Sequence, residues 1–370
     1  MIPATPGVGR RTRRLLDPLL AQAAALPGAD RYRKHFGAEA HLRILFLHAL
    51  SGSPSLRQTH ATLEALGWER VGLARPVSRS QLARSSTSRP SAPLELLFAR
   101  LVRRAQGRGR RGAAPAERRL LQAIDSTFLE LSAALCPGSR HGGHKAGVRL
   151  HVGFDPGPAI PAGLHLTLAD THDLRALAER DPAALAGWTL LIDRGYYGHR
   201  LFARLIAGGV DFVVPQHAQA TVRVRGERRV PAAPTRDGDV VLADQAVDVG
   251  SPTNHNSVVV PDLRLITTRN RRGEERRFLT TRRDLPARVV AEAYRRRWQI
   301  ELFFRWLKHE LGLVRPLGTS PQAVWLSVLL SGCVAILAVL AEPNRPPDVT
   351  RIAWVRPLAF ALLLTPADSS

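Results

Sequence analysis

The chain has 370 residues and a formal net charge of +22 at pH 7, with 53 lysine and arginine residues against 31 acidic ones. This length can hold one large domain or two to three smaller ones, and the surplus of positive charge favours nucleic acid as a partner, before an anionic membrane surface. The two cysteines, Cys136 and Cys333, are far apart. They argue against a disulfide scaffold or a zinc site and fit a reducing cytoplasm.

The first part of the chain is typical of short helices. Residues 1–29 form a poorly defined N-terminal segment, and residues 30–119 are predicted to form a helical domain, with helices over 38–50 and about 54–66. The basic tract over 103–119 is predicted to be a flexible linker that can follow phosphate groups.

A further helix, polar and basic, is expected to begin at Ser78 and to end before Pro90. A helix, a turn and then a short helix rich in serine and arginine suggest a helix-turn-helix element, which binds DNA with its second helix. Arg79 and Arg84 are the candidate DNA contacts on this helix. An ordinary helical bundle explains the pattern equally well.

From residue 120 the sequence changes to strands. Short apolar strands are predicted at residues 121–124, 148–154, 164–168, 189–192 and 210–215, with a helix over about 173–186. Residues 220–283 show alternating strands and a hairpin turn at 270–273, which predicts a β-rich insertion. A long helix then begins at 284–286, and the apolar run 324–341 is expected to be a buried core helix rather than a membrane span. Residues 343–370 form a C-terminal tail.

Three carboxylates stand out along this order of elements. Asp125 and Asp193 each lie at or just past the end of a predicted strand, and Glu301 lies on the later long helix. Carboxylates in such places can meet in a shallow cleft, and three of them can hold two Mg2+ or Mn2+ ions for phosphodiester chemistry. Other acids compete for the first two places, namely Asp155, Asp170 and Asp173.

The helix that carries Glu301 has an unusual polar face. Tyr294, Arg297, Glu301 and Lys308 fall within an arc of about 60° if each residue turns the helix by roughly 100°. The neighbouring residues are apolar nearly all round, so we expect the helix to be mostly buried and its carboxylate to need a partner. Solvated ion pairs of Glu301 with Arg297 and Arg305 are the plainer alternative.

These residues resemble those of the bacterial insertion-sequence DDE transposases that carry a Tyr-Arg-Glu-Lys signature. The resemblance covers roughly residues 30–342 and is carried by segments 124–127, 191–197, 311–313 and 317–320, by the spacing of residues 294, 297, 301 and 308, and by residues 55–57 and 77–80 in the helical part.

The resemblance implies an α/β fold with a ribonuclease-H-like mixed sheet core over residues 120–342, interrupted by the β-rich insertion at about 220–283 and preceded by a helical DNA-binding domain. It makes Asp125, Asp193 and Glu301 the metal-binding catalytic triad for Mg2+ or Mn2+, with two ions. Tyr294, Arg297 and Lys308 would contact DNA near the cleaved end. Arg194 is a further candidate DNA contact.

The implied activity is metal-dependent hydrolysis at transposon ends, followed by attack of the 3′-OH on target DNA. The partners would be the terminal inverted repeats and target DNA, bound by a homodimer in a synaptic complex. The place of action would be the bacterial cytoplasm at the nucleoid, without a membrane. A catalytically inactive or domesticated transposase-derived DNA-binding protein is the alternative, and a plain nuclease with the same core is another.

Overall fold

The computed structural model describes residues 6–30, 35–53, 55–110, 121–131, 140–141, 145–230, 234–252, 258–309, 316–318 and 320–341. They form two compact units. The first contains the described residues up to 110 and those from Phe304 onward, and the second contains most of the described residues between 121 and Phe303.

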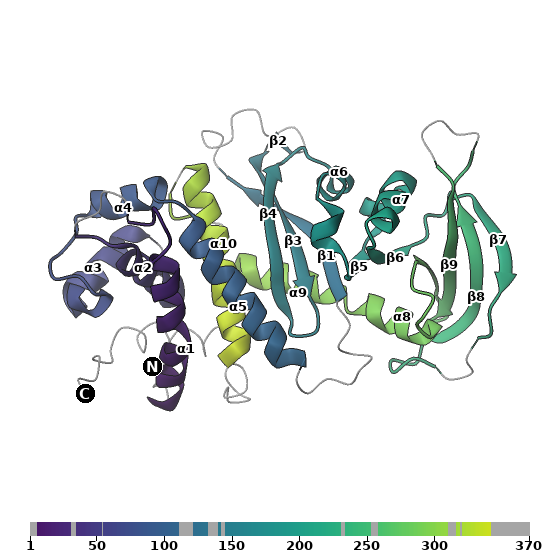
Figure 1. The fold of residues 1–370 in the computed structure, drawn as a ribbon, viewed down its shortest axis with the longest axis horizontal. Coiled ribbons are helices and arrows are strands. Elements are labelled where there is room, and N and C mark those ends of the chain that lie inside the picture. Colours follow the sequence, from purple (N-terminus) through teal and green to yellow (C-terminus); the bar gives the residue numbers. More distant parts are fainter. Residues whose placement is uncertain are drawn as a thin grey trace. The chain divides into compact units, whose positions relative to one another are not determined.

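The first unit is helical in its described residues (Figure 1). Its helices are α1 (Pro6–Ala24), α2 (Ala38–Ser51), α3 (Leu56–Leu66), the 3-10 helix η1 (Trp68–Val71), α4 (Arg79–Ser88), α5 (Ala92–Arg110) and α10 (Pro321–Ala341). Two of these differ from the sequence-based expectation. Helix α1 lies within residues 1–29, which were expected to be poorly defined. Residues 103–110 of the predicted linker belong to α5, and residues 111–119 lie outside the described part.

Helix α10 is the centre of the first unit, where it packs against α5, α2, α4 and α1. It is apolar all round, as expected for a helix that other helices surround. Within the described residues it is the one helix long and apolar enough to cross a membrane, but 78% of the apolar stretch is buried. The run 324–341 therefore lies in a core helix of this unit.

The start of helix α4 is fixed by hydrogen bonds between neighbouring residues. The Ser78 side chain accepts from the backbone N–H of Gln81, and the Gln81 side chain accepts from the backbone N–H of Ser78, which forms a capping box. Helix α3 packs against α4. Arg79 and Arg84 are both exposed on α4.

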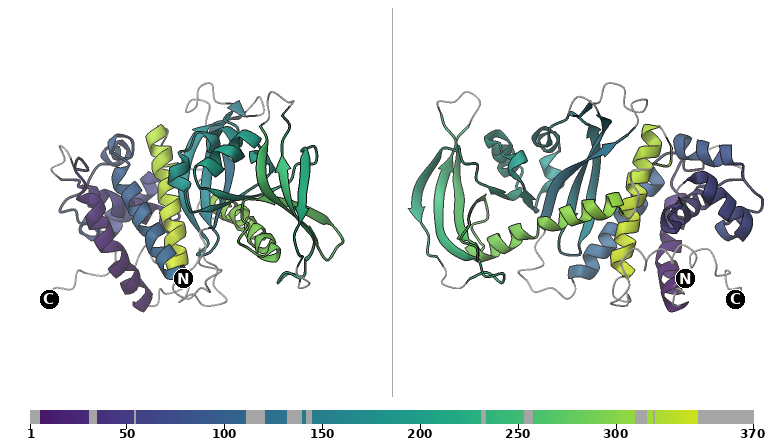
Figure 2. Two further views of the ribbon diagram at one scale, coloured as in Figure 1. Left: turned by 45° about the vertical axis from the view of Figure 1, so that its right-hand side comes forward. Right: turned by 180° about the vertical axis from the view of Figure 1, so that it is seen from behind.

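The second unit is built on one mixed sheet (Figures 1 and 2). The strand order is β2-β3-β1-β5-β6-β10-β9-β8-β7, with β4 paired to β3. The strands are β1 (Leu121–Glu130), β2 (Arg140–His141), β3 (Lys145–Asp155), β4 (Ile160–Leu168), β5 (Thr189–Ile192), β6 (Asp211–Pro215), β7 (Val222–Glu227), β8 (Val240–Val249), β9 (Val260–Arg269) and β10 (Glu275–Thr280).

Three parallel strands form the middle of this sheet. β5 pairs in parallel with β1 on one side and with β6 on the other. Four short helices follow or join these strands, namely α6 (Asp173–Ala178), the 3-10 helices η2 (Pro182–Leu185) and η3 (Arg194–Tyr196), and α7 (His199–Ala207). Leucines and phenylalanines of α6, η2 and α7 pack with Ile124, Leu190, Ile192 and Phe212 of the sheet. Helix α8 (Ala287–Arg295) lies on the other side of the sheet (Figures 1 and 2).

The insertion continues the same sheet instead of forming a separate one. β10 pairs antiparallel with β6, and β9, β8 and β7 follow in turn. The turn at residues 270–273 joins β9 to β10, where Asn270 accepts from the backbone N–H groups of Arg272 and Glu274.

Two helices are shorter than the sequence suggests. The stretch 173–186 is α6 followed by η2, because Asp181 caps a new turn that starts at Pro182. The long helix after Pro286 is interrupted at Arg296 and Arg297, which separates α8 from α9 (Trp298–His309). There the backbone bonds run from each N–H to the carbonyl three residues earlier, a tighter turn than that of an α-helix.

Candidate active site

Asp125 and Asp193 are brought together by the register of two parallel strands. Ile124 of β1 lies opposite Ile192 of β5, so the residue that follows each isoleucine lies at the same level of the sheet. Asp193 is just past the end of β5, as the sequence predicts. Asp125 is inside β1 rather than at its end, because β1 continues to Glu130 after β5 has stopped.

The turn after β5 fixes the orientation of Asp193. Its Oδ1 accepts from the backbone N–H of Gly195 at 2.8 Å and thereby caps η3. Among the described residues Asp193 forms no ion pair with a basic side chain. Its carboxylate therefore keeps most of its acceptor capacity.

Arg297 connects the first and third carboxylates of the predicted triad. Its guanidinium lies 3.4 Å from Asp125 Oδ2 and donates to Glu301 Oε1 at 2.6 Å. Asp125 and Arg297 are nearly buried, with side-chain exposures of 18% and 15%, whereas Glu301 is 32% exposed. One mostly buried cation is thus shared by two carboxylates that come from β1 and α9.

The carboxylates repel one another despite Arg297. Burial, together with the negative charges of Asp193 and Asp173, raises the pKa of Asp125 to about 6, although the Ser126 N–H and Arg297 act to lower it. Burial lowers the pKa of Arg297, but Tyr294, Glu301 and Asp125 outweigh it and raise that pKa overall. The site therefore carries more negative charge than its own cation balances.

This donor set fits a divalent cation. Carboxylate oxygens are the ligands that Mg2+ and Mn2+ prefer, and crowded carboxylates gain from an added positive charge. Gly195 leaves room there, since a Cβ on it would lie only 3.1 Å from Asp193 Oδ1. As the side chains stand, no three acidic, histidine or cysteine groups in the described part of the chain converge on one point. Arg297 fills the place between Asp125 and Glu301.

Comparison with known proteins identifies the family. Residues 117–337 match the family model described as the transposase DDE domain. A putative transposase, y4zB, of Sinorhizobium fredii is 31% identical over 273 residues, which cover 73% of this chain and 74% of the relative. The chain belongs to the DDE transposases. It is thus a DNA transposase of the insertion-sequence type, an enzyme of the polynucleotidyl transferase class that binds DNA, and its family generally uses divalent metal ions.

A second relative is the probable transposase for insertion sequence element IS5377 of Geobacillus stearothermophilus. It is 26% identical over 210 residues, which cover 55% of this transposase and 52% of the relative. Among solved structures, a piggyBac transposase synaptic complex with hairpin DNA gives a TM-score of 0.47 at 10% identity, with 88% of this chain and 70% of that chain covered.

Tyr294 lies beside the carboxylates of the transposase, although it is on α8 and not on the helix of Glu301. Its ring packs on Phe278 with centroids 4.8 Å apart, and the Arg297 guanidinium is 5.9 Å from the ring centroid. Burial raises the pKa of Tyr294 to about 12, and the charges of Arg297, Asp193 and Arg194 act on the same hydroxyl. The prediction of one continuous helix for the four polar residues is wrong, but Tyr294, Arg297 and Glu301 still converge.

The other residues predicted to contact DNA form no ion pair or hydrogen bond with the three carboxylates among the described residues. Arg194 is exposed directly after Asp193. Lys308 is on α9, about two turns beyond Glu301, and burial lowers its pKa. Arg79 and Arg84 belong to the first unit, where clefts beside α4 are lined by Arg57, His60 and Arg79 and by Arg75, Gln81 and Arg84.

The expectation that the helix of Glu301 is mostly buried does not hold on one face of α9. Trp298 and Leu302 are 53% and 47% exposed, although Ile300 and Leu307 are buried. Residues one helical turn apart share a face, so Trp298 and Leu302 form one exposed apolar strip on the helix that carries Glu301.

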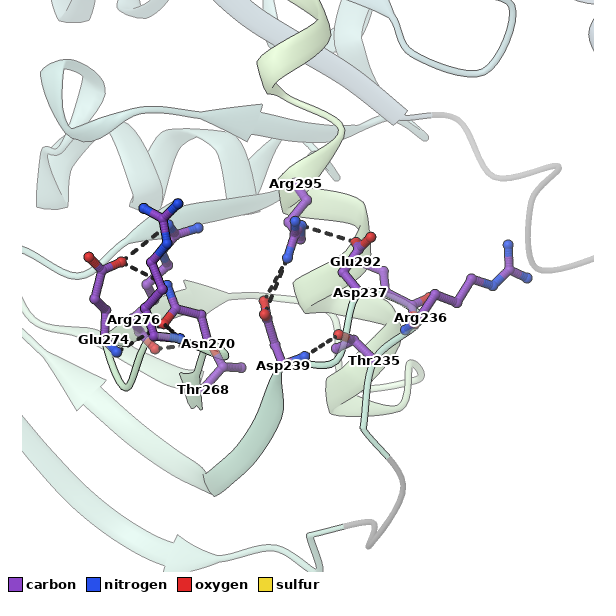
Figure 3. A network of polar contacts seen from close by, with 11 residues as sticks. Thr235, Arg236, Asp237, Asp239, Thr268, Asn270, Glu274, Arg276, Glu292 and Arg295 are labelled. Carbon is purple, nitrogen blue, oxygen red and sulfur yellow. Dashed lines mark hydrogen bonds and ion pairs between the residues drawn. The ribbon is translucent and has the colours of Figure 1, made fainter.

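A network of ion pairs connects the insertion to α8, the helix of Tyr294 (Figure 3). Arg295 lies 3.1 Å from Asp239 and 3.0 Å from Asp237, both in the segment that leads into β8. The backbone N–H of Arg236 donates to Glu292 at 2.9 Å. The segment before β8 is thus joined to the helix that carries Tyr294.

Sequence reasoning gave Asp155, Asp170 and Asp173 equal standing as rivals, and the structure separates them. Asp155 accepts from the backbone N–H of Gly157 at 3.0 Å in a turn, and Asp170 is exposed. Asp173 instead accepts from the Ser126 hydroxyl at 2.5 Å, one residue from Asp125. No sequence spacing pointed to this pair, which is 47 residues apart.

Proposed function

We propose that this transposase cuts the ends of its own mobile element with Asp125, Asp193 and Glu301, and joins the freed 3′ ends to target DNA. The observation that carries the proposal is the placement of these carboxylates: β1 and β5 align the two aspartates, and Arg297 links Asp125 to Glu301. The sheet order β4-β3-β1-β5-β6, with a parallel centre and an antiparallel edge, supports a ribonuclease-H-like core that the insertion at about 220–283 interrupts.

The three carboxylates would hold Mg2+ or Mn2+, two ions in all, which would activate the attacking oxygen and stabilise the leaving one. Asp125 and Glu301 would have to exchange Arg297 for the metal, because its guanidinium now lies between them. Arg297 would then be free to hold a phosphate by paired hydrogen bonds.

The DNA contacts follow from the same geometry. Tyr294, with its hydroxyl among Arg297, Asp193 and Arg194, would donate to a phosphate oxygen at the cleaved end. Lys308 and Arg194 would hold further phosphates, and the spacing of residues 294, 297, 301 and 308 would be the Tyr-Arg-Glu-Lys signature. In the helical domain, α4 would present Arg79 and Arg84 to DNA.

The reaction has two phosphoryl transfers. Water attacks the phosphorus at the end of the element, and the bond from that phosphorus to the 3′ oxygen of the element breaks. The products are a 3′-OH on the element and a 5′-phosphate on the flanking DNA. That 3′-OH then attacks a target phosphodiester, so one bond forms as another breaks. The enzyme would act as a homodimer that pairs two terminal inverted repeats in a synaptic complex, at the nucleoid in the bacterial cytoplasm.

The test uses the full chain with Mg2+ and a DNA duplex in which flanking DNA follows the element's inverted repeat. The strand to be cleaved is labelled at its 5′ end, within the element, and a supercoiled plasmid is the target. We expect a nick at the 3′ end of the element and covalent transfer of the label to the plasmid. Nicking without joining would make the protein a nuclease. Binding without either product would make it a transposase-derived DNA-binding protein.

A further inference from the structure

A fourth carboxylate, Asp173, lies next to the proposed catalytic triad. Its Oδ1 accepts from the Ser126 hydroxyl at 2.5 Å and lies 3.5 Å from the Arg149 guanidinium. Its side chain is 25% exposed. Asp173 begins α6, but the side chain is turned to β1 and not back along its own short helix.

Ser126 joins this carboxylate to Asp125 in two ways. The hydroxyl of Ser126 donates to Asp173, while the backbone N–H of Ser126 donates to Asp125 Oδ1 at 2.8 Å. Arg149 donates to the same hydroxyl at 3.1 Å, so the side chain of Ser126 has a donor on one side and an acceptor on the other. The peptide group that holds Asp125 is thereby fixed from both sides.

Strand geometry explains the arrangement. Successive side chains of a strand point to opposite faces, so Ser126 faces α6 with Ile124, and Asp125 faces the side of Arg297. Asp173 therefore contacts the back of the strand whose front carries Asp125. A contact of this kind orients the catalytic group and leaves the substrate side open.

A second link runs through the turn after β5. The point where a Cβ on Gly195 would lie is 3.1 Å from Asp193 Oδ1 and 3.9 Å from Asp173 Oδ2, so both carboxylates border the same small space. Tyr196, the next residue, is fully buried, and its hydroxyl has no hydrogen-bond partner among the described residues. Burial raises the pKa of Tyr196, and the charges that act on it most are Asp173, Asp125 and Asp193. A buried donor is thus left available beside three carboxylates.

A single cation faces the charge of Asp173 among the described residues. His151 is 3.8 Å away, but burial lowers the pKa of His151 to about 4, so at neutral pH this ring adds no positive charge. Arg149 is the one cation that pairs with Asp173 among the described residues. A carboxylate kept next to two others raises their mutual repulsion, which makes a merely stabilising role a poor explanation.

We propose that Asp173 is a positioning residue for DNA cleavage, which acts through Ser126 to hold Asp125 and, across Gly195, keeps Asp193 turned to the same site. This inference rests on the proposed role of the triad. Outer partners of this type orient the groups that hold a metal, and their loss costs roughly 10- to 100-fold in metal affinity or activity.

The experiment compares Asp173→Ala, Ser126→Ala and the double variant of the full chain. Single-turnover cleavage of the inverted-repeat duplex, DNA affinity and Mn2+ affinity by electron paramagnetic resonance are measured for each. We expect cleavage and Mn2+ affinity to fall about 10- to 100-fold with DNA affinity unchanged. Because both residues act through one hydrogen bond, the double variant should be no worse than the more impaired single variant. Ser126→Thr, which keeps the hydroxyl, should restore most of the loss.

Asp170→Ala is the matched control, since Asp170 is an exposed acid three residues earlier. The inference is overturned if Asp173→Ala matches this control in cleavage rate and in Mn2+ affinity. It is also overturned if the fold-loss of the double variant equals the product of the two single losses. Ser126→Ala decides the case if Asp173→Ala does not fold: wild-type Mn2+ affinity with Ser126→Ala would also overturn the inference. Asp173→Asn, which can still accept from Ser126, should stay close to wild type. Asp125→Asn distinguishes failure of this inference from failure of the proposed catalytic triad, because full cleavage by that variant would refute the triad itself.

Discussion

Two charged regions of the second unit differ in how completely their charges are paired. In the insertion, Arg264 and Asp244 are each 3% exposed and form a two-bond ion pair at 2.7 and 2.6 Å, and Arg264 also donates to the carbonyls of Arg282 and Leu285. At the candidate active site, one guanidinium pairs with Asp125 and Glu301. Asp193 accepts from a backbone N–H, and no cation among the described residues pairs with it.

The difference shows what each region is for. A buried charge that has all its partners fixes a loop, and here Arg264 ties β8 and β9 to the segment before α8. A group of carboxylates with too few partners weakens the fold, and its surplus charge is available to a ligand. The site is therefore expected to lose activity when it is neutralised, and the insertion to lose stability.

The largest loss of stability should follow from Asp244→Ala. Removing one partner leaves the Arg264 charge buried and unpaired, which costs about 3–5 kcal/mol of unfolding free energy. Glu275→Ala is the control, because Glu275 and its partner Arg269 are 49% and 51% exposed and such a pair contributes about 0–1 kcal/mol. Equal chemical denaturation curves for the two variants would show that the insertion does not depend on this pair.

The pH dependence of the unfolding free energy should reveal the cost of keeping the Asp125 carboxylate ionised in the folded protein. Its folded pKa is raised to about 6, above the unfolded value of about 3.9. Between these values the folded state keeps a proton that the unfolded state has lost, so stability falls as pH rises. Asp125→Asn should remove this fall. Without added metal, the stability of the variant relative to wild type should increase between pH 4 and pH 6, and a constant difference would contradict the account.

A smaller effect is expected from Asp239→Ala. Arg295 is 40% exposed and keeps Asp237 at 3.0 Å, so we expect a loss of about 1 kcal/mol in unfolding free energy. Because Arg295 follows Tyr294 on α8, the variant should also weaken binding of the element end slightly. A loss as large as that of Asp244→Ala would mean that exposure does not separate the two pairs.

The smallest effect is expected from Lys308→Ala. If Lys308 holds one phosphate, the slope of log affinity for the inverted-repeat duplex against log salt concentration should fall by about 1. Affinity titrations at several salt concentrations measure it. An unaltered slope would assign Lys308 a structural role.

Much of the site could be predicted because its parts are local. β5 is a buried apolar run that ends directly before Asp193, and two parallel strands need only a register to align Asp125 with it. The continuation of β1 past Asp125 was missed because Asp-Ser-Thr is also typical of turns. In the helical unit, the capping box at Ser78 fixed the start of α4 by the same local rules.

The rest depends on partners far apart in the sequence. Three consecutive arginines favour a helix, so the break between α8 and α9 has no local signal, and Arg297 pairs with a carboxylate 172 residues away. Asp173 accepts a hydrogen bond from Ser126, 47 residues away in the sequence. A single sequence contains no pattern that predicts a contact between residues so far apart. The exposed strip of Trp298 and Leu302 likewise follows from tertiary packing and not from periodicity.

Strand cleavage by Glu301→Gln tests the central claim most directly. The variant keeps the size of the side chain and can still accept from Arg297, but it loses the charge. On the inverted-repeat duplex with Mg2+, we predict a loss of at least about 1,000-fold in the cleavage rate, with DNA affinity and unfolding free energy close to those of wild type. Cleavage at the wild-type rate would remove Glu301 from the site and contradict the account.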